Sequence, residues 1–453
     1  MNDFDRSRAP APGPAAAFRF PAFSHRRLAS GLDTYVVEER RTPLVSMRLL
    51  LPHSGADDPP QRPGLASFTA GLLEDGTTSR SSQQIAEEIE SLGGSLGSGA
   101  GWSSSAVSAR VLSRDFDAGL ALLADVALRP AFADLEIERQ RRDRLAEWLR
   151  RRDQAAALAE EGFAAALYGD SPYGHTLLGD RASLRAIRRE EIVDFWSSRR
   201  AARGSTLLIV GDVEAARVEE AAERALADLG SAPPPPAPRL DAPPRRRRVI
   251  LIDRPGAAQT ELRIGHWGPP RPHPDRSVLA LVNTILGGKF TSRINLNLRE
   301  RHGFTYGASS AFVDRRGPGP FMVGTAVRND VAAQAASEIL SEIARLRSEP
   351  VGGDEIADGV RYLRGVFPYG MQSLGGILGR LEDLAVFSLP DDYFARHFAE
   401  LETVDAARLA EVASEHLRPD DAVILAVGPA AELEPAFERF GAVEVAPAAP
   451  AAA

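Results

Sequence analysis

The stretch GLASFTAGLLEDGT, residues 64–77, has apolar residues at helical spacing and predicts an amphipathic helix packed beneath a loop. It contains no histidine. A similar segment, SVLALVNTILGG at residues 277–288, follows after about 215 residues, which is the spacing of a duplicated domain rather than a solenoid repeat.

The surroundings of the two segments repeat as well. Each follows an extended apolar segment and a loop with glycine and proline, VSMRLLLPHSGADDPP at residues 45–60 and ELRIGHWGPPRPHPD at residues 261–275. A strand, a glycine turn and a helix recur at residues 205–226 and 421–440. Because helices come in blocks instead of alternating with strands, we predict an α+β fold of two homologous domains, each a mostly antiparallel sheet with helices packed on one face.

Proline-rich and alanine-rich stretches set the domain boundaries. SAPPPPAPRLDAPPRRRR, residues 231–248, predicts a semi-rigid linker, because a proline run imposes extended geometry and lacks backbone donors. The domains are therefore expected at residues 18–230 and 249–445. Residues 1–17 and 446–453 have too little apolar surface to order and are predicted to be disordered tails.

Composition excludes several function classes. The formal net charge of −8 gives no basic footprint for nucleic acid. The chain has no cysteine, which excludes disulfides, thiolate zinc sites and cysteine nucleophiles. No apolar run is long enough for a membrane helix, and the first residues make a poor secretory signal, so we expect a cytoplasmic protein without membrane contacts.

From residue 18 to residue 445 the order of these landmarks resembles the pitrilysin/insulinase family of zinc metallopeptidases, which includes the mitochondrial processing peptidase and its bacterial relatives. In that family the first helix carries HxxEH. Its two histidines lie on one helical face and share a zinc ion, and the glutamate activates the bound water.

The resemblance places this motif on residues that cannot bind a metal. The histidine positions fall on Ser67 and Gly71, and the glutamate position falls on Ala70. The family's third ligand, a glutamate about 76 residues further on, corresponds to Glu147, which we interpret as an ordinary helix residue rather than a surviving ligand. No two of the eight histidines lie three to five residues apart on one helix, although ligands gathered from distant positions stay possible.

The second half retains a family phrase, GGKFTSRINLNLRERHGFTYGASSAF, residues 287–312. In two-subunit members the chain without HxxEH contributes an arginine and a tyrosine from this phrase, and the resemblance puts these roles on Arg299 and Tyr306. A guanidinium and a phenol suit the carbonyl groups of an extended peptide. Arg293 and Arg301 compete for the role, and a salt bridge of Arg299 with a neighbouring acid is the plain structural alternative.

Other family-like stretches carry less chemistry. Residues 91–115 resemble a strand, turn and strand whose edge accepts an extended peptide, or are simple turn residues. Residues 170–180, DSPYGHTLLGD, match a family loop in which Tyr173 and His175 receive no role.

The resemblance implies a non-catalytic, peptide-binding subunit of a heterodimeric zinc metalloendopeptidase. No catalytic residue and no metal are expected in this chain, and the zinc would be held by a homologous partner that carries HxxEH. Two alternatives stay open: a scaffold subunit derived from a peptidase, and an active hydrolase with relocated metal ligands.

Overall fold

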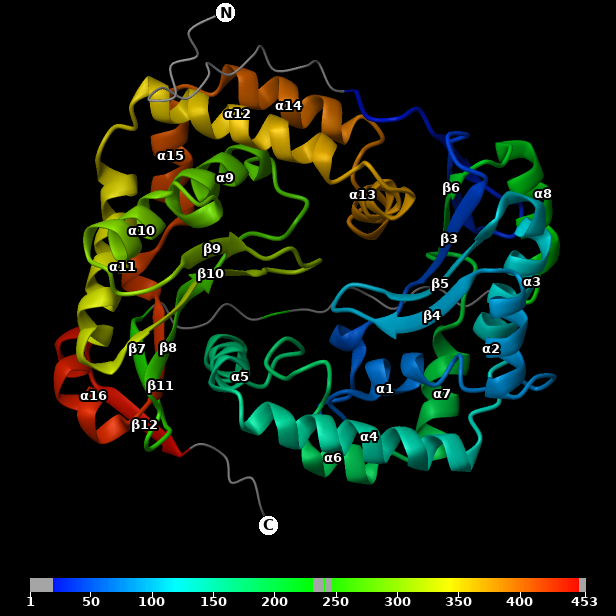
Figure 1. The fold of residues 1–453 in the computed structure, drawn as a ribbon, viewed down its shortest axis with the longest axis horizontal. Helices are drawn as coiled ribbons and strands as arrows, with labels where there is room; N and C mark the ends of the chain where they lie inside the picture. Colours follow the sequence, from blue (N-terminus) through cyan, green and yellow to red (C-terminus); the bar gives the residue numbers. More distant parts are fainter. Residues whose placement is uncertain (1–18, 231–239, 241–245, 448–453) are drawn as a thin grey trace, which may run out of the picture.

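The computed structural model describes residues 19–230, 240 and 246–447 (Figure 1). The predicted tail at residues 1–17 and most of the predicted linker lie outside the described residues. Two boundaries need correction. Arg248, counted in the linker, begins a strand, and Ala446 and Pro447, counted in the C-terminal tail, end one, because both segments find backbone hydrogen-bond partners in a sheet.

The first half is built on a six-stranded sheet in the order β1-β2-β6-β3-β5-β4. Only the β2 and β6 pair is parallel; the other neighbours are antiparallel. The strands are β1 (Ser24–Arg27), β2 (Asp33–Glu38), β3 (Leu44–Leu51), β4 (Ser95–Ala100), β5 (Ser105–Leu112) and β6 (Thr206–Gly211).

The second half repeats this sheet in the order β12-β7-β11-β8-β10-β9. Here β7 pairs in parallel with both β11 and β12, whereas β1 and β2 of the first sheet are antiparallel, and β11, β8, β10 and β9 follow antiparallel. Its strands are β7 (Arg248–Asp253), β8 (Gln259–Trp267), β9 (Ala308–Phe312), β10 (Pro320–Arg328), β11 (Val423–Gly428) and β12 (Val443–Pro447). The predicted duplication and the predicted α+β fold with mostly antiparallel sheets are confirmed.

The helices of the two halves also follow one order. The first half contains α1 (Leu65–Gly71), α2 (Ser82–Ser91), α3 (Phe116–Leu128), α4 (Asp134–Arg152), α5 (Ala155–Tyr168), α6 (Arg181–Ala186), α7 (Arg189–Arg199) and α8 (Ala215–Ala225). The second contains α9 (Arg276–Asn283), α10 (Arg293–Asn295), α11 (Ala332–Ser348), α12 (Gly353–Tyr369), α13 (Leu374–Val386), α14 (Tyr393–Thr403), α15 (Ala406–His416) and α16 (Ala430–Phe437). By this order α1 corresponds to α9, α4 to α12, and α5 to α13.

Each sheet is buried on both faces, and the two halves exchange helices to achieve this. Successive side chains of a strand point to opposite faces. In β3, Leu49 packs into the core of its own half, whereas Leu50 packs with Leu381 of α13 from the other half. In β7, Leu251 and Ile252 divide in the same way, Ile252 packing with α5 from the first half. The prediction of helices on one face therefore described only the helices that each half supplies to itself.

Helix α5 approaches the second sheet closely enough to require a glycine. A Cβ on Gly162 would lie 2.5 Å from Ile252 Cδ1 and 2.9 Å from Leu425 Cδ1. Around this contact Leu158 and Phe163 are buried, and each such side chain contributes about 1.5–3 kcal/mol. The exchange therefore links the two halves through apolar packing.

Polar contacts between the halves surround the same region. The loop of residues 313–319, which joins β9 to β10, reaches the first half, and the Tyr168 hydroxyl donates to the Pro318 carbonyl at 3.0 Å. The Trp267 indole donates to the Leu167 carbonyl at 2.9 Å. Figure 1 shows this hairpin pointing from the second half toward the ends of β4 and β5.

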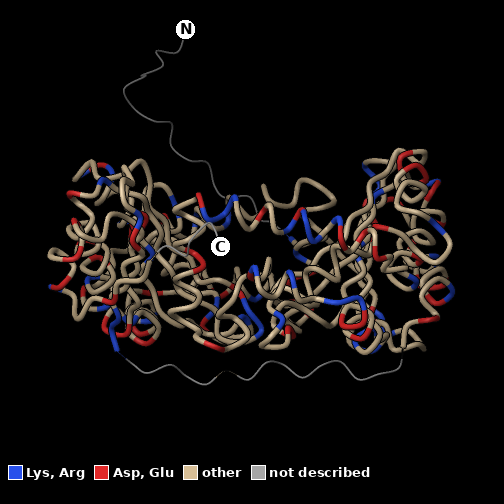
Figure 2. The backbone as a smooth tube through the Cα atoms, turned by 90° about the horizontal axis from the view of Figure 1, so that it is seen from below, with Lys and Arg blue, Asp and Glu red and all other residues tan. Residues whose placement is uncertain are grey.

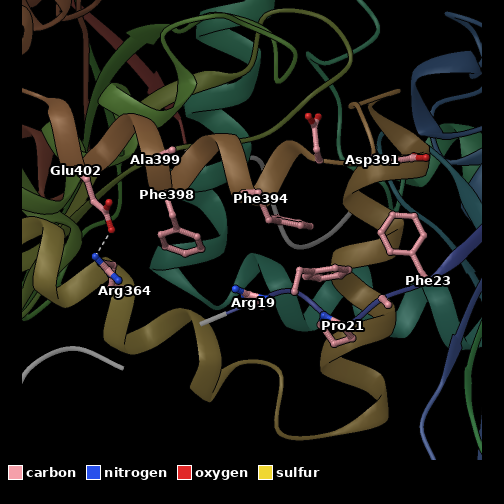
Figure 3. A pocket seen from close by; sticks show the side chains of 13 residues that line it. Arg19, Pro21, Phe23, Arg364, Asp391, Phe394, Phe398, Ala399 and Glu402 are labelled. Atoms are coloured by element: carbon pink, nitrogen blue, oxygen red, sulfur yellow. Dashed lines mark hydrogen bonds and ion pairs between the residues drawn. The ribbon is translucent and has the colours of Figure 1, made fainter. Parts of the chain in front are cut away.

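The N-terminal segment, residues 19–23, forms a further link. It runs beside α14 (Figure 3), where Phe20 stacks on Phe394 with ring centroids 4.8 Å apart before the chain enters β1 in the first sheet. A cavity of about 760 Å³ lies between this segment, α12 and α14. Among its charged groups, Arg364 pairs with Glu402 and Asp391 pairs with His25.

Candidate functional site

Helix α1 is short and held at its start by a buried carboxylate. Asp58 accepts hydrogen bonds from the backbone amides of Gly64 (2.7 Å) and Ala66 (2.6 Å). Gly64 has φ +89°, and a Cβ there would lie 2.7 Å from the Leu178 carbonyl, so only glycine fits. Burial raises the pKa of Asp58 to about 7, against the lowering effect of these two amides.

The face of α1 that the family would use for zinc is closed by an arginine from α4. The Arg144 guanidinium donates to the Ser67 hydroxyl (Nη1–Oγ 2.8 Å) and to the Ser67 carbonyl. The Ser67 hydroxyl in turn donates to the Leu177 carbonyl. Arg144 also lies over the Phe68 ring, 5.2 Å from its centroid. Ser67 is thus bonded to two neighbouring segments and is not a vacant ligand position.

Gly71 and Ala70 complete the packing of this face. A Cβ on Gly71 would lie 2.3 Å from Gln140 Nε2 and 3.2 Å from an Arg144 terminal nitrogen, so the absent side chain makes room for α4. Ala70 is fully buried. Burial lowers the pKa of Arg144 to about 10, and the guanidinium stays positively charged at neutral pH. These residues do not fit a zinc ion, since they supply a fixed cation and no imidazole.

Glu147 lies one turn beyond Arg144 on α4 and points elsewhere. Its carboxylate pairs with Arg150 (Nε–Oε2 3.0 Å), three residues on, and its side chain is 42% exposed. The structure therefore brings Ser67, Ala70 and Gly71 together against α4. Among the described residues, Glu147 forms no hydrogen bond with any of these three.

One group of potential metal ligands does converge within the described ranges: His273, Asp275 and His416, in the second half. Its atoms already bond one another. His416 Nε2 lies 2.9 Å from an Asp275 carboxylate oxygen, and Arg408 pairs with the other oxygen. An arginine on the only carboxylate of the group opposes a second cation, so we interpret these residues as a link between α15 and the start of α9.

Arg299 and Tyr306 lie on the surface of the second half. Arg299 belongs to a π-helical turn, Leu296–Arg301, and its guanidinium lies 4.5 Å from the centroid of the Phe290 ring. It also pairs with Glu300 (Nε–Oε1 3.2 Å), which is the neighbouring acid that the structural alternative required. Tyr306 lies in the loop before β9, and its side chain is 94% exposed to solvent.

The two competing arginines differ sharply. Arg293 forms a two-pronged ion pair with Glu355 of α12, at 2.8 and 2.7 Å, which fixes the turn to that helix. Arg301 is exposed and has no ion pair among the residues that the structure describes. Arg293 is therefore committed to structure, whereas Arg299 and Arg301 are accessible.

Several features of this surface were missed by sequence reasoning. Phe290 is 62% exposed beside Arg299, and α12 presents Tyr362, Val366 and Tyr369, four and then three residues apart, to solvent. This spacing places the three on one helical face. The signal was visible as an apolar stripe along α12, but a stripe predicts burial as readily as an interaction surface.

The first sheet ends in an edge strand, and charges of both signs are spread over the surface (Figure 2). β4 lies at a free edge of the first sheet, and a Cβ on Gly97 or Gly99 would meet nothing within 4 Å. In the view of Figure 2, basic and acidic residues are interspersed over both halves. No helix of the described residues is long and apolar enough to cross a membrane.

Comparison with known proteins places this geometry in a family. Residues 35–181 match the family model described as Insulinase (Peptidase family M16), and residues 186–363 match Peptidase M16 inactive domain. A Rickettsia bellii protein named an uncharacterized zinc protease is 27% identical over 74% of this chain and 80% of its own length.

Solved structures have a similar fold. A crystal structure of a peptidase M16 inactive domain from Pseudomonas fluorescens is similar with a TM-score of 0.84 at 26% identity, over 90% of this chain and 98% of that one. A protease from Helicobacter pylori shares the fold, with a TM-score of 0.83 at 17% identity over 90% of this chain and 99% of that one. The two family matches follow one another along most of the chain, which therefore belongs to the insulinase (M16) peptidase family and lacks the HxxEH motif of its zinc site.

Proposed function

We propose that this chain is the non-catalytic, substrate-binding subunit of a two-chain zinc metalloendopeptidase of the type of the mitochondrial processing peptidase. Its partner would be a homologous chain that carries HxxEH and holds the zinc, and the two would enclose the peptide between them. The observation that carries the proposal is a contrast within one chain: Arg144 fills the degenerate metal face, while Arg299 and Tyr306 stand accessible in the other half.

The side chains of Arg299 and Tyr306 suit the binding of a peptide backbone that the partner chain cleaves. The Arg299 guanidinium is held in place by Phe290 and Glu300 and keeps donors for a substrate carbonyl or carboxylate. The Tyr306 hydroxyl donates a hydrogen bond to a peptide carbonyl as negative charge develops on its oxygen. Neither group activates water, so this chain alone is expected to be silent.

Their position favours action on a partner. Arg299 and Tyr306 follow α10 in the second half, whereas α1 lies in the first half, and Figure 1 shows the two helices well apart. The exposed aromatic residues of this surface, Phe290, Tyr362 and Tyr369, are of the kind enriched where proteins meet. A cytoplasmic location stays part of the proposal.

The test is the rate at which a candidate HxxEH partner cleaves a fluorogenic peptide, titrated with this chain. We expect no cleavage by this chain alone and a saturable rise in the rate of the partner. Arg299→Ala and Tyr306→Phe should each lower the kcat of the partner in the presence of this chain at least about tenfold, because each removes a hydrogen bond made in the transition state.

Arg301→Ala is the matched control, because Arg301 is an exposed arginine of the same turn without an ion pair among the described residues. It should leave the activation of the partner unchanged. A partner that is equally active without this chain would support a scaffold instead, and an equal loss in Arg299→Ala and Arg301→Ala would point to general surface charge.

A further inference from the structure

A second cavity, of about 390 Å³, lies between the two halves. The first half contributes Trp102, Tyr173 and His175, and the second contributes Arg315 and Met322. Its volume falls within the range of about 300–1,000 Å³ that small-molecule sites occupy, and its walls are mostly apolar and aromatic with few polar groups, as such sites are.

Arg315 is the unusual group in this cavity. Its guanidinium carbon lies 4.6 Å from the centroid of the Trp102 ring and 5.2 Å from that of Tyr173. No carboxylate or hydrogen-bond acceptor of the described residues meets its guanidinium, and its Nε is buried without a partner. Burial lowers the pKa of Arg315 to about 10, so it stays cationic at neutral pH.

The other charged groups of the cavity contrast with Arg315. Arg151 and Arg152 both pair with Glu161, which neutralises the acid nearest to them. Arg316, the next residue of the loop, donates from Nε to the Val386 carbonyl at 3.2 Å. Glu160 lines the cavity but is exposed, at its solvent side. Arg315 thus lies against two aromatic rings, and its guanidinium donates no hydrogen bond to any described residue.

A second polar atom of the wall is also unused. His175 Nε2 is buried, has no hydrogen-bond partner and lies 3.8 Å from a carboxylate oxygen of Asp58, and its Nδ1 lies 2.9 Å from the Thr176 carbonyl. That carbonyl accepts, so Nδ1 carries the proton and Nε2 is an acceptor, able to receive a hydrogen bond from a ligand N–H or O–H. Burial lowers the pKa of His175, which keeps this ring neutral at neutral pH.

We propose that this cavity binds the carboxylate of a peptide residue with an apolar or aromatic body, with Arg315 as the carboxylate partner and the Trp102 and Tyr173 walls as the contact for the body. The two rings are nearly perpendicular to each other (interplanar angle 89°) and accept none of the hydrogen bonds of the guanidinium, so its donors are left for a planar carboxylate. The carboxylate is that of a peptide C-terminus or of an acidic side chain.

The cavity adjoins the degenerate metal face, since the Leu177 carbonyl accepts from Ser67 and Leu177 lines the cavity. The inference deepens the proposed function and rests on it for the class of ligand, a peptide. The cavity adds a preference for a peptide residue that carries a carboxylate, which Arg299 and Tyr306 do not provide.

The test compares three fluorescein-labelled hexapeptides binding to the full chain by fluorescence anisotropy. One ends in phenylalanine with a free carboxylate, one is its C-terminal amide, and one is the amide with glutamate in place of the last residue but one. We expect the free acid or the glutamate peptide to bind at least about tenfold more tightly than the plain amide, a ratio worth about 1.4 kcal/mol. Which of the two gains identifies the source of the carboxylate.

Arg315→Gln should bring this ratio to about one without weakening the plain amide, and Arg315→Lys should restore part of it. Arg316→Gln, on the same loop but bonded away from the cavity, is the matched control and should keep the wild-type ratio. The comparison of peptides within the wild-type chain needs no variant, so a misfolded variant does not remove the test.

Equal binding of all three peptides to the wild-type chain would overturn the inference and leave peptide binding intact. A ratio that survives Arg315→Gln would also overturn it, because the carboxylate would be read elsewhere. Absence of binding by all three peptides would instead count against the peptide-binding function.

Discussion

The helices α1 and α4 of the first half correspond to α9 and α12 of the second. The two pairs differ in which helix carries the glycine at the contact and in whether the side chains that face it are polar or apolar. In the first half the glycine is on α1, at Gly71, and α4 supplies the polar side chains of Gln140 and Arg144. In the second half the glycine is on α12, at Gly359, where a Cβ would lie 2.6 Å from Leu281 Cδ1 of α9.

This difference bears on the contrast between the face of α1, which is sealed by Arg144, and the surface of the second half, where Arg299 is accessible. Arg144 closes the first face with hydrogen bonds, and a buried polar contact of this kind must keep its partners. The second pair closes with apolar side chains, and Arg299, in the π-helical turn that follows α10, lies on Phe290 at the surface. A lost motif therefore does not leave an empty site; the neighbouring helix fills it.

The largest expected effect is on zinc affinity. Restoring Ser67→His, Ala70→Glu and Gly71→His should fail to create a zinc site, because Arg144 keeps its charge at that face and Gln140 occupies the space. Adding Gln140→Ala and Arg144→Ala should raise zinc affinity at least about 100-fold, since a cation no longer opposes the metal. Competition with a fluorescent zinc chelator measures both affinities.

Circular dichroism of each variant is the control for folding. Stoichiometric zinc in the triple variant would mean that Arg144 leaves the face freely and that the two helix pairs differ less than described. Failure of the larger variant would count against Glu147, now paired with Arg150, turning to act as the third ligand.

The second effect is on stability. Arg144→Met retains the bulk of the side chain and removes its bonds to Ser67, so we expect a loss of about 2–3 kcal/mol in the free energy of unfolding. Arg150→Met, on the same helix, removes an exposed ion pair and should cost no more than about 0.5 kcal/mol. Urea unfolding followed by circular dichroism compares the two. Equal losses would show that Arg144 is no more than a surface charge.

The third effect depends on pH and uses one histidine from each half. Burial lowers the pKa of His53 to about 3 and that of His266 to about 4. A lowered pKa means that the unfolded chain takes up the proton first, so stability falls as the pH drops below about 6.5. Between pH 7 and pH 5 each histidine should cost about 2 kcal/mol.

His53 has no hydrogen-bond partner, whereas His266 accepts from the Arg418 amide at 2.9 Å. His53→Leu should therefore flatten the pH dependence with little loss at pH 7. His266→Leu should flatten it equally but lose about 1–3 kcal/mol at pH 7, through the unpaired amide. Urea midpoints at the two pH values measure both, and an unchanged slope in His53→Leu would contradict the buried, neutral ring.

The sequence predicted the duplication and the α+β fold of each half with a mostly antiparallel sheet, because these depend on local patterns. It did not predict the exchange of α5 and α13. Periodicity identifies an apolar helix face, such as that of Leu158 and Phe163, but not the sheet that covers it.

Arg144 escaped prediction for a related reason. It is one of several arginines on α4 and differs from Arg150 only in facing a helix of small residues. Arg315 is similar: the sequence shows an arginine in a turn, while its aromatic neighbours Trp102 and Tyr173 come from the other half. Sites made by contacts between distant segments are invisible to spacing.

The smallest expected effect on stability is at Arg299 and Tyr306. Arg299→Ala removes a partly exposed pair with Glu300 and Tyr306→Phe removes a hydroxyl in solvent, so each should change the free energy of unfolding by no more than about 0.5 kcal/mol. Urea unfolding measures this beside Arg293→Ala, whose ion pair with Glu355 joins α10 to α12 and should cost more. A large loss at Arg299 would give it the structural role that Arg144 has in the first half. A small loss of stability, combined with lost activation of the partner, would show that the surface of Arg299 and Tyr306 serves binding, whereas the face of α1 that Arg144 closes serves stability.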